Sequence, residues 1–321
     1  MNKTKEITEA GLFAALLVVI ITGVFYIPLL GGIMMLFVPV PIVILTMRVK
    51  PLYATASTVV AILLSSALVT LPSAVSIGAF AFCIGLPVGI GFKRKMDGLS
   101  IFFIGTVGAA VGFFITLELI ELISGLSFIG MMEQSAPMVI DTYTQMFAAV
   151  EELGVSNTLT KEEIKKVLDE GIFAFKLLLP SLIIMSSMMY AIINMLMSIQ
   201  IFKRVKIDYK PLGKFESFRY PKHVAYGAMG MMLLAFFLGT LEYIDSQLIT
   251  ANFLYLFQMI FAIEGASLIY YFIKKKSGKG MAVVVILLVF IMGLAQLVAY
   301  LGFFDVMMDL RRLDQMKQNK D

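Results

Sequence analysis

The chain has few of the residues that metal centres, disulfides and nucleophilic active sites need. It has one cysteine, Cys83, one histidine, His223, and no tryptophan among 321 residues. Cys83 lies inside an apolar run and His223 in a basic loop, so neither suggests a disulfide framework or a metal cluster. The motifs G-x-S-x-G, H-E-x-x-H, G-x-x-x-x-G-K-[ST] and C-x-x-C are also missing. We therefore expect no enzyme and no cofactor or metal.

Charge is scarce as well. Apolar residues make up 60% of the chain and charged residues 15%, whereas an average soluble domain is about half apolar and a quarter charged. The net charge of +4 comes from basic residues that lie between apolar runs, which indicates cytoplasmic loops rather than nucleic-acid binding. The composition predicts an all-α, polytopic integral membrane protein whose surroundings are the lipid bilayer.

The apolar runs predict about nine transmembrane helices, because about 20 apolar residues span the hydrocarbon core as a helix. The runs cover residues 10–30, 33–47, 52–71, 74–92, 99–123, 173–202, 224–241, 248–273 and 281–304. The second run is short and contains Pro39 and Pro41. If it is re-entrant, the number of spans is eight. Gly108 and Gly112 in the fifth run form a small-xxx-small pair, which predicts close approach of a neighbouring helix.

Alternating these spans from a cytoplasmic N-terminus places the strongly basic loops inside, as the positive-inside rule requires. The acidic segment 124–171 and the turn at 242–247 then lie outside. We expect a multi-pass protein of the cytoplasmic (plasma) membrane with its N-terminus in the cytoplasm. Nine spans conflict with this pattern at one place, because they leave the amphipathic tail 305–321 outside despite Arg311 and Arg312.

Four regions follow from these patterns. Residues 1–202 form a six-helix membrane region, residues 203–223 a basic cytoplasmic loop, residues 224–304 three further membrane helices, and residues 305–321 a tail. Within the first region, the polar segment 124–171 should hold two short amphipathic helices. One has helical spacing over residues 136–153, and the other begins at the capping box formed by Thr160 and Glu163.

Ionisable and polar residues inside the spans are the candidate functional residues, because they are costly in hydrocarbon and tend to face a cavity or a partner. Glu264 lies well inside the eighth run and shares a helix face with Ser267 and Tyr271. Its carboxylate can bind a ligand, relay a proton or bond a neighbouring helix. Gln258 in the same run can line a cavity. Glu118 and Glu121, near the outer end of the fifth run, either contact substrate or reach the water interface.

Three stretches, TKEITEAGLFAALL, VPVPIVILTMRVKPLYAT and GFFDVMMDLRRL, resemble the YybS family of bacterial multi-span membrane proteins, which is grouped under a domain of unknown function. The first six spans also resemble the substrate-binding S components of energy-coupling-factor transporters, which have an A-x-x-x-A face on the first helix. Ala10 and Ala14 match that face. The resemblance implies small-molecule binding and docking of a coupling subunit at these two alanines, although three extra spans and the long 124–171 segment depart from the pattern.

Two function hypotheses remain. The first is a transport-related membrane protein whose front half binds a small molecule of unknown identity. The second is a membrane scaffold or regulatory protein that recruits a partner through the basic 203–223 loop.

Overall fold

A computed structural model of the chain describes residues 3–27, 30–152, 160–238 and 246–311. Every regular element in these ranges is helical. Six of the helices are long and apolar enough to cross a membrane, and three shorter helices, Pro51–Ser65, Lys222–Leu238 and Ala295–Met308, are apolar too. The all-α, polytopic membrane fold predicted from composition is therefore confirmed. That the shorter helices Pro51–Ser65 and Lys222–Leu238 each cross the bilayer stays a prediction.

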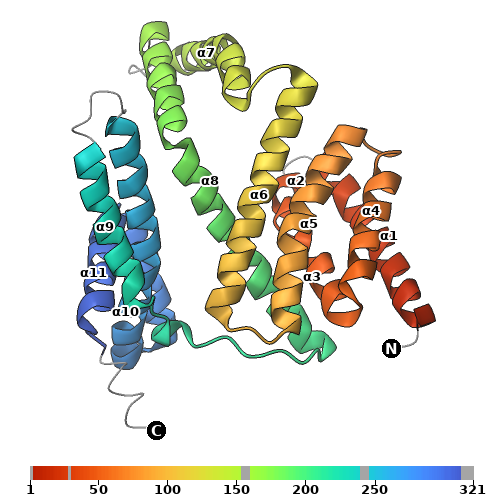
Figure 1. The fold of residues 1–321 in the computed structure, drawn as a ribbon. Helices are drawn as coiled ribbons and strands as arrows, with labels where there is room; N and C mark the ends of the chain where they lie inside the picture. The colour runs from red at the N-terminus through yellow and green to blue at the C-terminus, as the bar shows by residue number, and fades with distance from the viewer. Residues whose placement is uncertain (1–2, 28–29, 153–159, 239–245, 312–321) are drawn as a thin grey trace. The chain divides into compact units, whose positions relative to one another are not determined.

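The chain divides into two compact units. Unit 1 comprises Met1–Lys176 and Ser186–Pro211, and unit 2 comprises Leu177–Met185 and Leu212–Asp321. The division at residue 211 falls inside the basic loop expected at 203–223. The long helix α8, Lys161–Val205, contributes to both units (Figure 1).

The front of unit 1 consists of five helices: α1 (Lys3–Tyr26), α2 (Leu30–Met35), α3 (Pro39–Arg48), α4 (Pro51–Ser65) and α5 (Leu71–Lys93). The second predicted span is thus two helices separated by a turn at residues 36–38, and Pro39 begins the second of them. The third predicted span is shorter than expected, because α4 ends at Ser65 and the chain turns before Leu71. A buried stripe on α1 packs into the core of this unit.

Helices α5 and α6 (Gly98–Ser124) cross through glycines. A Cβ added to Gly108 would lie 2.0 Å from the carbonyl oxygen of Cys83, and one added to Gly112 would lie 2.9 Å from the Phe80 ring. Only glycine permits so close an approach at these positions. The close contact predicted from the small-xxx-small pair is confirmed.

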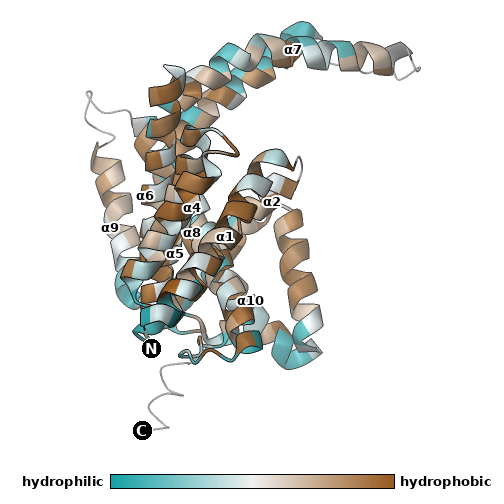
Figure 2. Ribbon diagram, turned by 90° about the vertical axis from the view of Figure 1, so that its right-hand side faces the viewer, coloured by the Kyte–Doolittle hydropathy of each residue, from teal (hydrophilic) through white to brown (hydrophobic). Residues whose placement is uncertain are grey.

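Helix α7, Phe128–Glu152, follows α6 in the chain and precedes α8 (Figure 1). Hydrophilic and hydrophobic residues alternate along it (Figure 2), as expected for an amphipathic helix. The capping box at Thr160 is present, with the Glu163 carboxylate accepting from the Thr160 N–H at 2.8 Å. The second amphipathic helix is not a separate element, however. The helix that Thr160 starts continues without a break into the sixth span, through Gly171 and Pro180.

Unit 2 contains the short 3-10 helix η1 (Phe215–Ser217), α9 (Lys222–Leu238), α10 (Ser246–Ile291) and α11 (Ala295–Met308). Helix α10 is two helical pieces that meet at Gly278, where φ is 86° and the backbone is not helical. Asn252 of α10 also bridges a gap in the ladder of α8: its Oδ1 accepts from the Ser181 N–H at 3.0 Å, and its Nδ2 donates to the Leu177 carbonyl at 2.5 Å.

The ninth predicted span, 281–304 as one helix, is wrong. The second piece of α10 ends at residue 291 in a Schellman motif, in which the Leu294 N–H donates to the Val289 carbonyl and the Gly293 N–H to the Phe290 carbonyl, at 3.1 Å each. Gly293 has φ of 74°, a conformation that favours glycine. Residues 279–291 and α11 are each shorter than the roughly 20 residues that a spanning helix needs.

Candidate functional site

The most unusual polar group in unit 2 is the carboxylate of Glu264. The apolar sequence around it makes α10 a candidate membrane span, and the Glu264 side chain within it is fully buried. Its Oε2 accepts a hydrogen bond from the backbone N–H of Tyr220 at 2.9 Å, and its Oε1 accepts from Nη2 of Arg311. An ionised carboxylate in such a place requires partners of this kind.

Arg311, three residues beyond the end of α11, supplies most of the donors at the site. Its side chain is fully buried. Nε and Nη2 donate to Oδ2 of Asp305 at 2.8 and 2.5 Å, which places a second buried carboxylate beside Glu264. Nη1 donates to the Ser267 hydroxyl at 2.7 Å. The fork of the guanidinium thus joins α10, α11 and the residues after α11.

The same guanidinium holds the segment 212–221, which we call the strap. Nη1 of Arg311 donates to the carbonyl of Glu216 at 3.0 Å, and Nη2 donates to the carbonyl of Phe218 at 2.9 Å. The Ser267 hydroxyl also donates to the strap, to the Phe215 carbonyl at 2.5 Å. The strap has little regular structure of its own, so these side chains satisfy backbone groups that no helix satisfies.

Two glycines allow α10 and α11 to meet at the site. A Cβ on Gly265 would lie 2.0 Å from the carbonyl oxygen of Val298, and a Cβ on Gly302 would lie 2.0 Å from the carbonyl oxygen of Phe261. The helix backbones are therefore in contact on either side of Glu264. This close crossing brings Asp305 to the same depth as Glu264.

Two further ion pairs lie at the edge of the strap. Lys274 pairs with Glu216, and this hydrogen bond lowers the pKa of the Glu216 carboxyl. Arg219 pairs with Asp309 at 2.8 Å and donates to the Val306 carbonyl at 3.0 Å. Together with Arg311, these contacts hold the end of α11 against the strap.

The cluster has more negative than positive charge. Two carboxylates, of Glu264 and Asp305, face one guanidinium, and all three side chains have no solvent exposure. Oδ1 of Asp305 and the hydroxyl of Tyr220 are buried with no hydrogen-bond partner in the described part of the chain. Burial, and then the nearby Glu264 carboxylate, raise the pKa of the Tyr220 phenol, so it stays protonated. A formal charge of −1 is left in a fully buried site.

The structure brings together only some of the residues singled out in the sequence. Ser267 lies in the cluster with Glu264. Tyr271 and Gln258 are half-buried elsewhere on α10, and the Tyr271 ring packs edge-on against Phe272. Glu118 and Glu121 are exposed on α6 in unit 1 and contribute nothing to the cluster. A substrate role for any of these residues stays a prediction.

Ala10 and Ala14 lie on the covered face of α1. Their exposed fractions are 8% and 4%, and the Ala10 carbonyl accepts a hydrogen bond from the Ser57 hydroxyl of α4 at 2.8 Å. Ala14 belongs to the core cluster of unit 1 with Leu17 and Ile21. Docking of a coupling subunit at these alanines stays a prediction, and such a partner would have to displace part of this packing.

Sequence reasoning missed Asp305, Arg311 and the strap. Asp305 stands in the apolar stretch GFFDVMM, and that isolation was a usable signal for a buried partner of Glu264. Arg311 carried no such signal, since it lies in a tail of mixed charge. The pairing of Arg311 with Glu264 joins residues 47 positions apart, which local patterns do not reveal.

The fold defines a polytopic, all-α membrane protein. Helices suit a bilayer because they satisfy their own backbone hydrogen-bonding groups. The chain belongs to the family described as predicted membrane protein (DUF2232), whose model matches residues 15–306. It is 24% identical over 303 residues to the uncharacterized protein YybS of Bacillus subtilis (strain 168), covering 91% of this chain and 92% of that protein. The resemblance to the YybS family is confirmed. No solved structure matches the chain, and the likeness to S components stays a prediction.

Proposed function

We propose that the protein is a transport-related membrane protein in which the buried cluster of unit 2 takes up and releases a proton. The observation that carries the proposal is the unequal charge of the cluster: two fully buried carboxylates face a single buried guanidinium. Leaving a net charge in hydrocarbon is costly, so such a site binds a proton or a cation.

Geometry favours the proton over a larger ion. Nη2 of Arg311 donates both to Oε1 of Glu264 and to Oδ2 of Asp305, so the two carboxyl groups meet at one nitrogen, and two carboxyl groups that share a site commonly share one proton. The Arg311 guanidinium and the Tyr220 N–H already donate hydrogen bonds to three of the four carboxylate oxygens of Glu264 and Asp305. Uptake of a proton changes the charge that Arg311 experiences, which links protonation of the cluster to the strap, whose carbonyls Arg311 binds.

The test is proton flux into proteoliposomes that contain the purified protein and an entrapped pH dye, driven by a potassium diffusion potential. We expect wild-type vesicles to acidify faster than protein-free vesicles. Glu264→Gln and Asp305→Asn should each abolish most of the difference. Glu162→Gln, which alters an exposed carboxylate of α8 outside the cluster, serves as the matched control and should behave as wild type. Equal rates in wild-type and protein-free vesicles would refute the proposal.

A further inference from the structure

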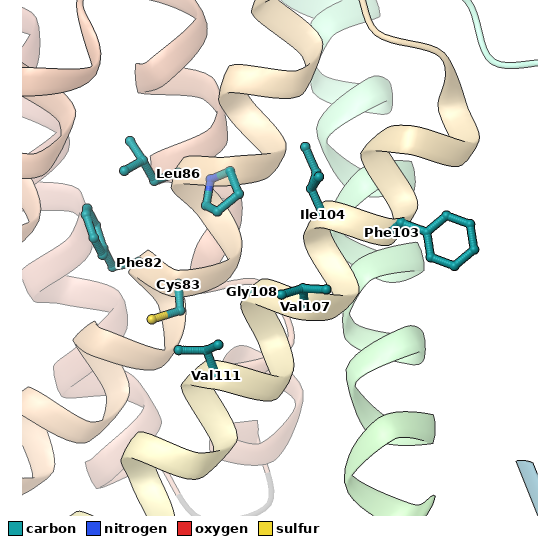
Figure 3. Close-up of a pocket in the computed structure, with 9 residues that line it drawn as sticks. Phe82, Cys83, Leu86, Phe103, Ile104, Val107, Gly108 and Val111 are labelled. Carbon is teal, nitrogen blue, oxygen red and sulfur yellow. The ribbon is translucent and has the colours of Figure 1, made fainter.

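An apolar groove lies on unit 1, between α5 and α6, outside the cluster described above. Its volume is about 550 Å³, within the range of small-molecule sites. The walls are formed by side chains from two stretches that lie side by side in Figure 3. They are Phe82, Cys83, Leu86 and Pro87 of α5, and Phe103, Ile104, Val107, Gly108 and Val111 of α6.

The shape of the groove follows from the helix crossing. At Gly108 the backbone of α6 lies against the carbonyl of Cys83, so no side chain fills the space there. On either side of this contact the helices present bulky side chains, among them Val107, which is 63% exposed. The crossing is thus the floor of the groove, and the side chains form its walls (Figure 3).

The position of the groove determines what can fill it. Both α5 and α6 are long and apolar enough to cross a membrane, and the lining residues run from the second turn of α6 to its middle and along the second half of α5. An open groove at that depth faces hydrocarbon rather than water. Its lining is apolar throughout, so an acyl chain fits it and a polar solute does not.

One end of the groove leads to a cation. Helix α5 ends in the basic run Lys93, Arg94, Lys95. Arg94 is seven residues, or two helical turns, beyond Pro87 and so lies on the same face, about 10 Å further along the helix axis. This distance suits a phosphate at the membrane surface above a chain in the groove.

The neighbours of Arg94 have other roles. Lys93 donates to the carbonyl of Thr46 at 2.9 Å, and Lys95 pairs with Asp208 at 2.6 Å. The acidic residue of the same turn, Asp97, accepts from the hydroxyl and the N–H of Ser100, which lowers the pKa of its carboxyl. Arg94 is exposed and has no ion-pair partner in the described part of the chain.

We propose that unit 1 binds an anionic phospholipid, with one acyl chain in the α5–α6 groove and the phosphate on Arg94. Further cations lie at this end of unit 1 with Arg94 and strengthen the electrostatic attraction for an anionic headgroup. Lys203 and Arg204 at the end of α8 are held nearby, since the Phe92 and Phe202 rings pack edge-on with centroids 5.2 Å apart. Such basic clusters favour anionic over neutral headgroups.

The lack of tryptophan in the chain provides the assay. Val107→Trp places a single indole in the groove, and Val111→Trp is a second position there should the first variant fold poorly. Each variant is reconstituted in phosphatidylcholine vesicles that contain a small fraction of brominated phosphatidylglycerol or of brominated phosphatidylcholine. Bromine quenches tryptophan at contact, so the quenching reports which lipid occupies the groove.

We expect brominated phosphatidylglycerol to occupy the groove about fivefold more readily than brominated phosphatidylcholine, the preference expected for one cation near the surface. Arg94→Gln should remove most of that preference, whereas Lys165→Gln, at the other end of α8, should leave it intact. Phe114→Trp, an exposed position on α6 outside the groove, should show no preference. Excess inorganic phosphate should not displace the lipid. Equal quenching by the two lipids at both groove positions, or a preference unchanged by Arg94→Gln, would overturn the proposal.

Discussion

Replacing Arg311 with methionine should destabilise unit 2 strongly. The substitution keeps much of the apolar volume but removes the donors to both buried carboxylates and to the carbonyls of Glu216 and Phe218. Removing one partner of a buried ion pair costs about 3–5 kcal/mol, because an uncompensated charge remains. Two carboxylates are left here, so we expect the upper half of that range.

Glu264→Gln should be much milder. The amide oxygen of glutamine can still accept from the Tyr220 N–H, and the cluster then contains one carboxylate and one guanidinium, with no net charge. We expect a loss of about 1 kcal/mol, that of a weakened buried hydrogen bond. The structure therefore predicts an ordered series in which the cationic member of the cluster matters far more than either anionic one.

The assay is unfolding in mixed micelles with a rising fraction of sodium dodecyl sulfate, followed by circular dichroism. A triple variant, Glu264→Gln with Asp305→Asn and Arg311→Met, removes all three charges and should recover most of the loss seen in Arg311→Met. Lys165→Met, which replaces an exposed cation, should change stability by less than about 0.5 kcal/mol. A triple variant as unstable as Arg311→Met would show that lost packing, rather than unpaired charge, explains the effect, and our reasoning would be wrong.

Two further predictions concern the α10–α11 hairpin. Gly302→Ala should cost about 3 kcal/mol or separate the helices, because its Cβ would lie 2.0 Å from a backbone oxygen that cannot rotate away, while Gly227→Ala, with nothing within 4 Å, should be close to neutral in the same unfolding assay. The reversal at Gly293 predicts that the residues just after α11 lie on the side where α10 has its lysines. In a Cys83→Ser background, Lys276→Cys and Leu310→Cys should therefore react with an impermeant maleimide from the same side of sealed vesicles, and labelling from opposite sides would contradict the hairpin.

Hydropathy predicted most of the membrane helices, because a long apolar run has few alternatives in a bilayer. Residue type within a single predicted helix also identified Glu264 as a polar residue in a span and predicted the close approach of helices at Gly108. Hydropathy failed where the backbone changes direction inside an apolar run. Gly293 ends a helix through its positive φ and two hydrogen bonds, and neither affects mean hydropathy. The partner of Glu264 was missed because contacts between distant segments leave no local pattern.

The turn at Gly293 also accounts for the one place where nine spans conflicted with the positive-inside rule. If residues 281–304 were one crossing, Arg311 would lie on the side opposite Lys274. The structure instead places Arg311 against the strap, whose Glu216 pairs with Lys274 through its side chain and binds Arg311 through its carbonyl. Both cations therefore lie at the same end of unit 2, and Arg311 agrees in position with the lysines of the preceding loop. Arg311 therefore has two roles. It agrees with the positive-inside rule on the side of Lys274, and it pairs with the buried carboxylates of Glu264 and Asp305.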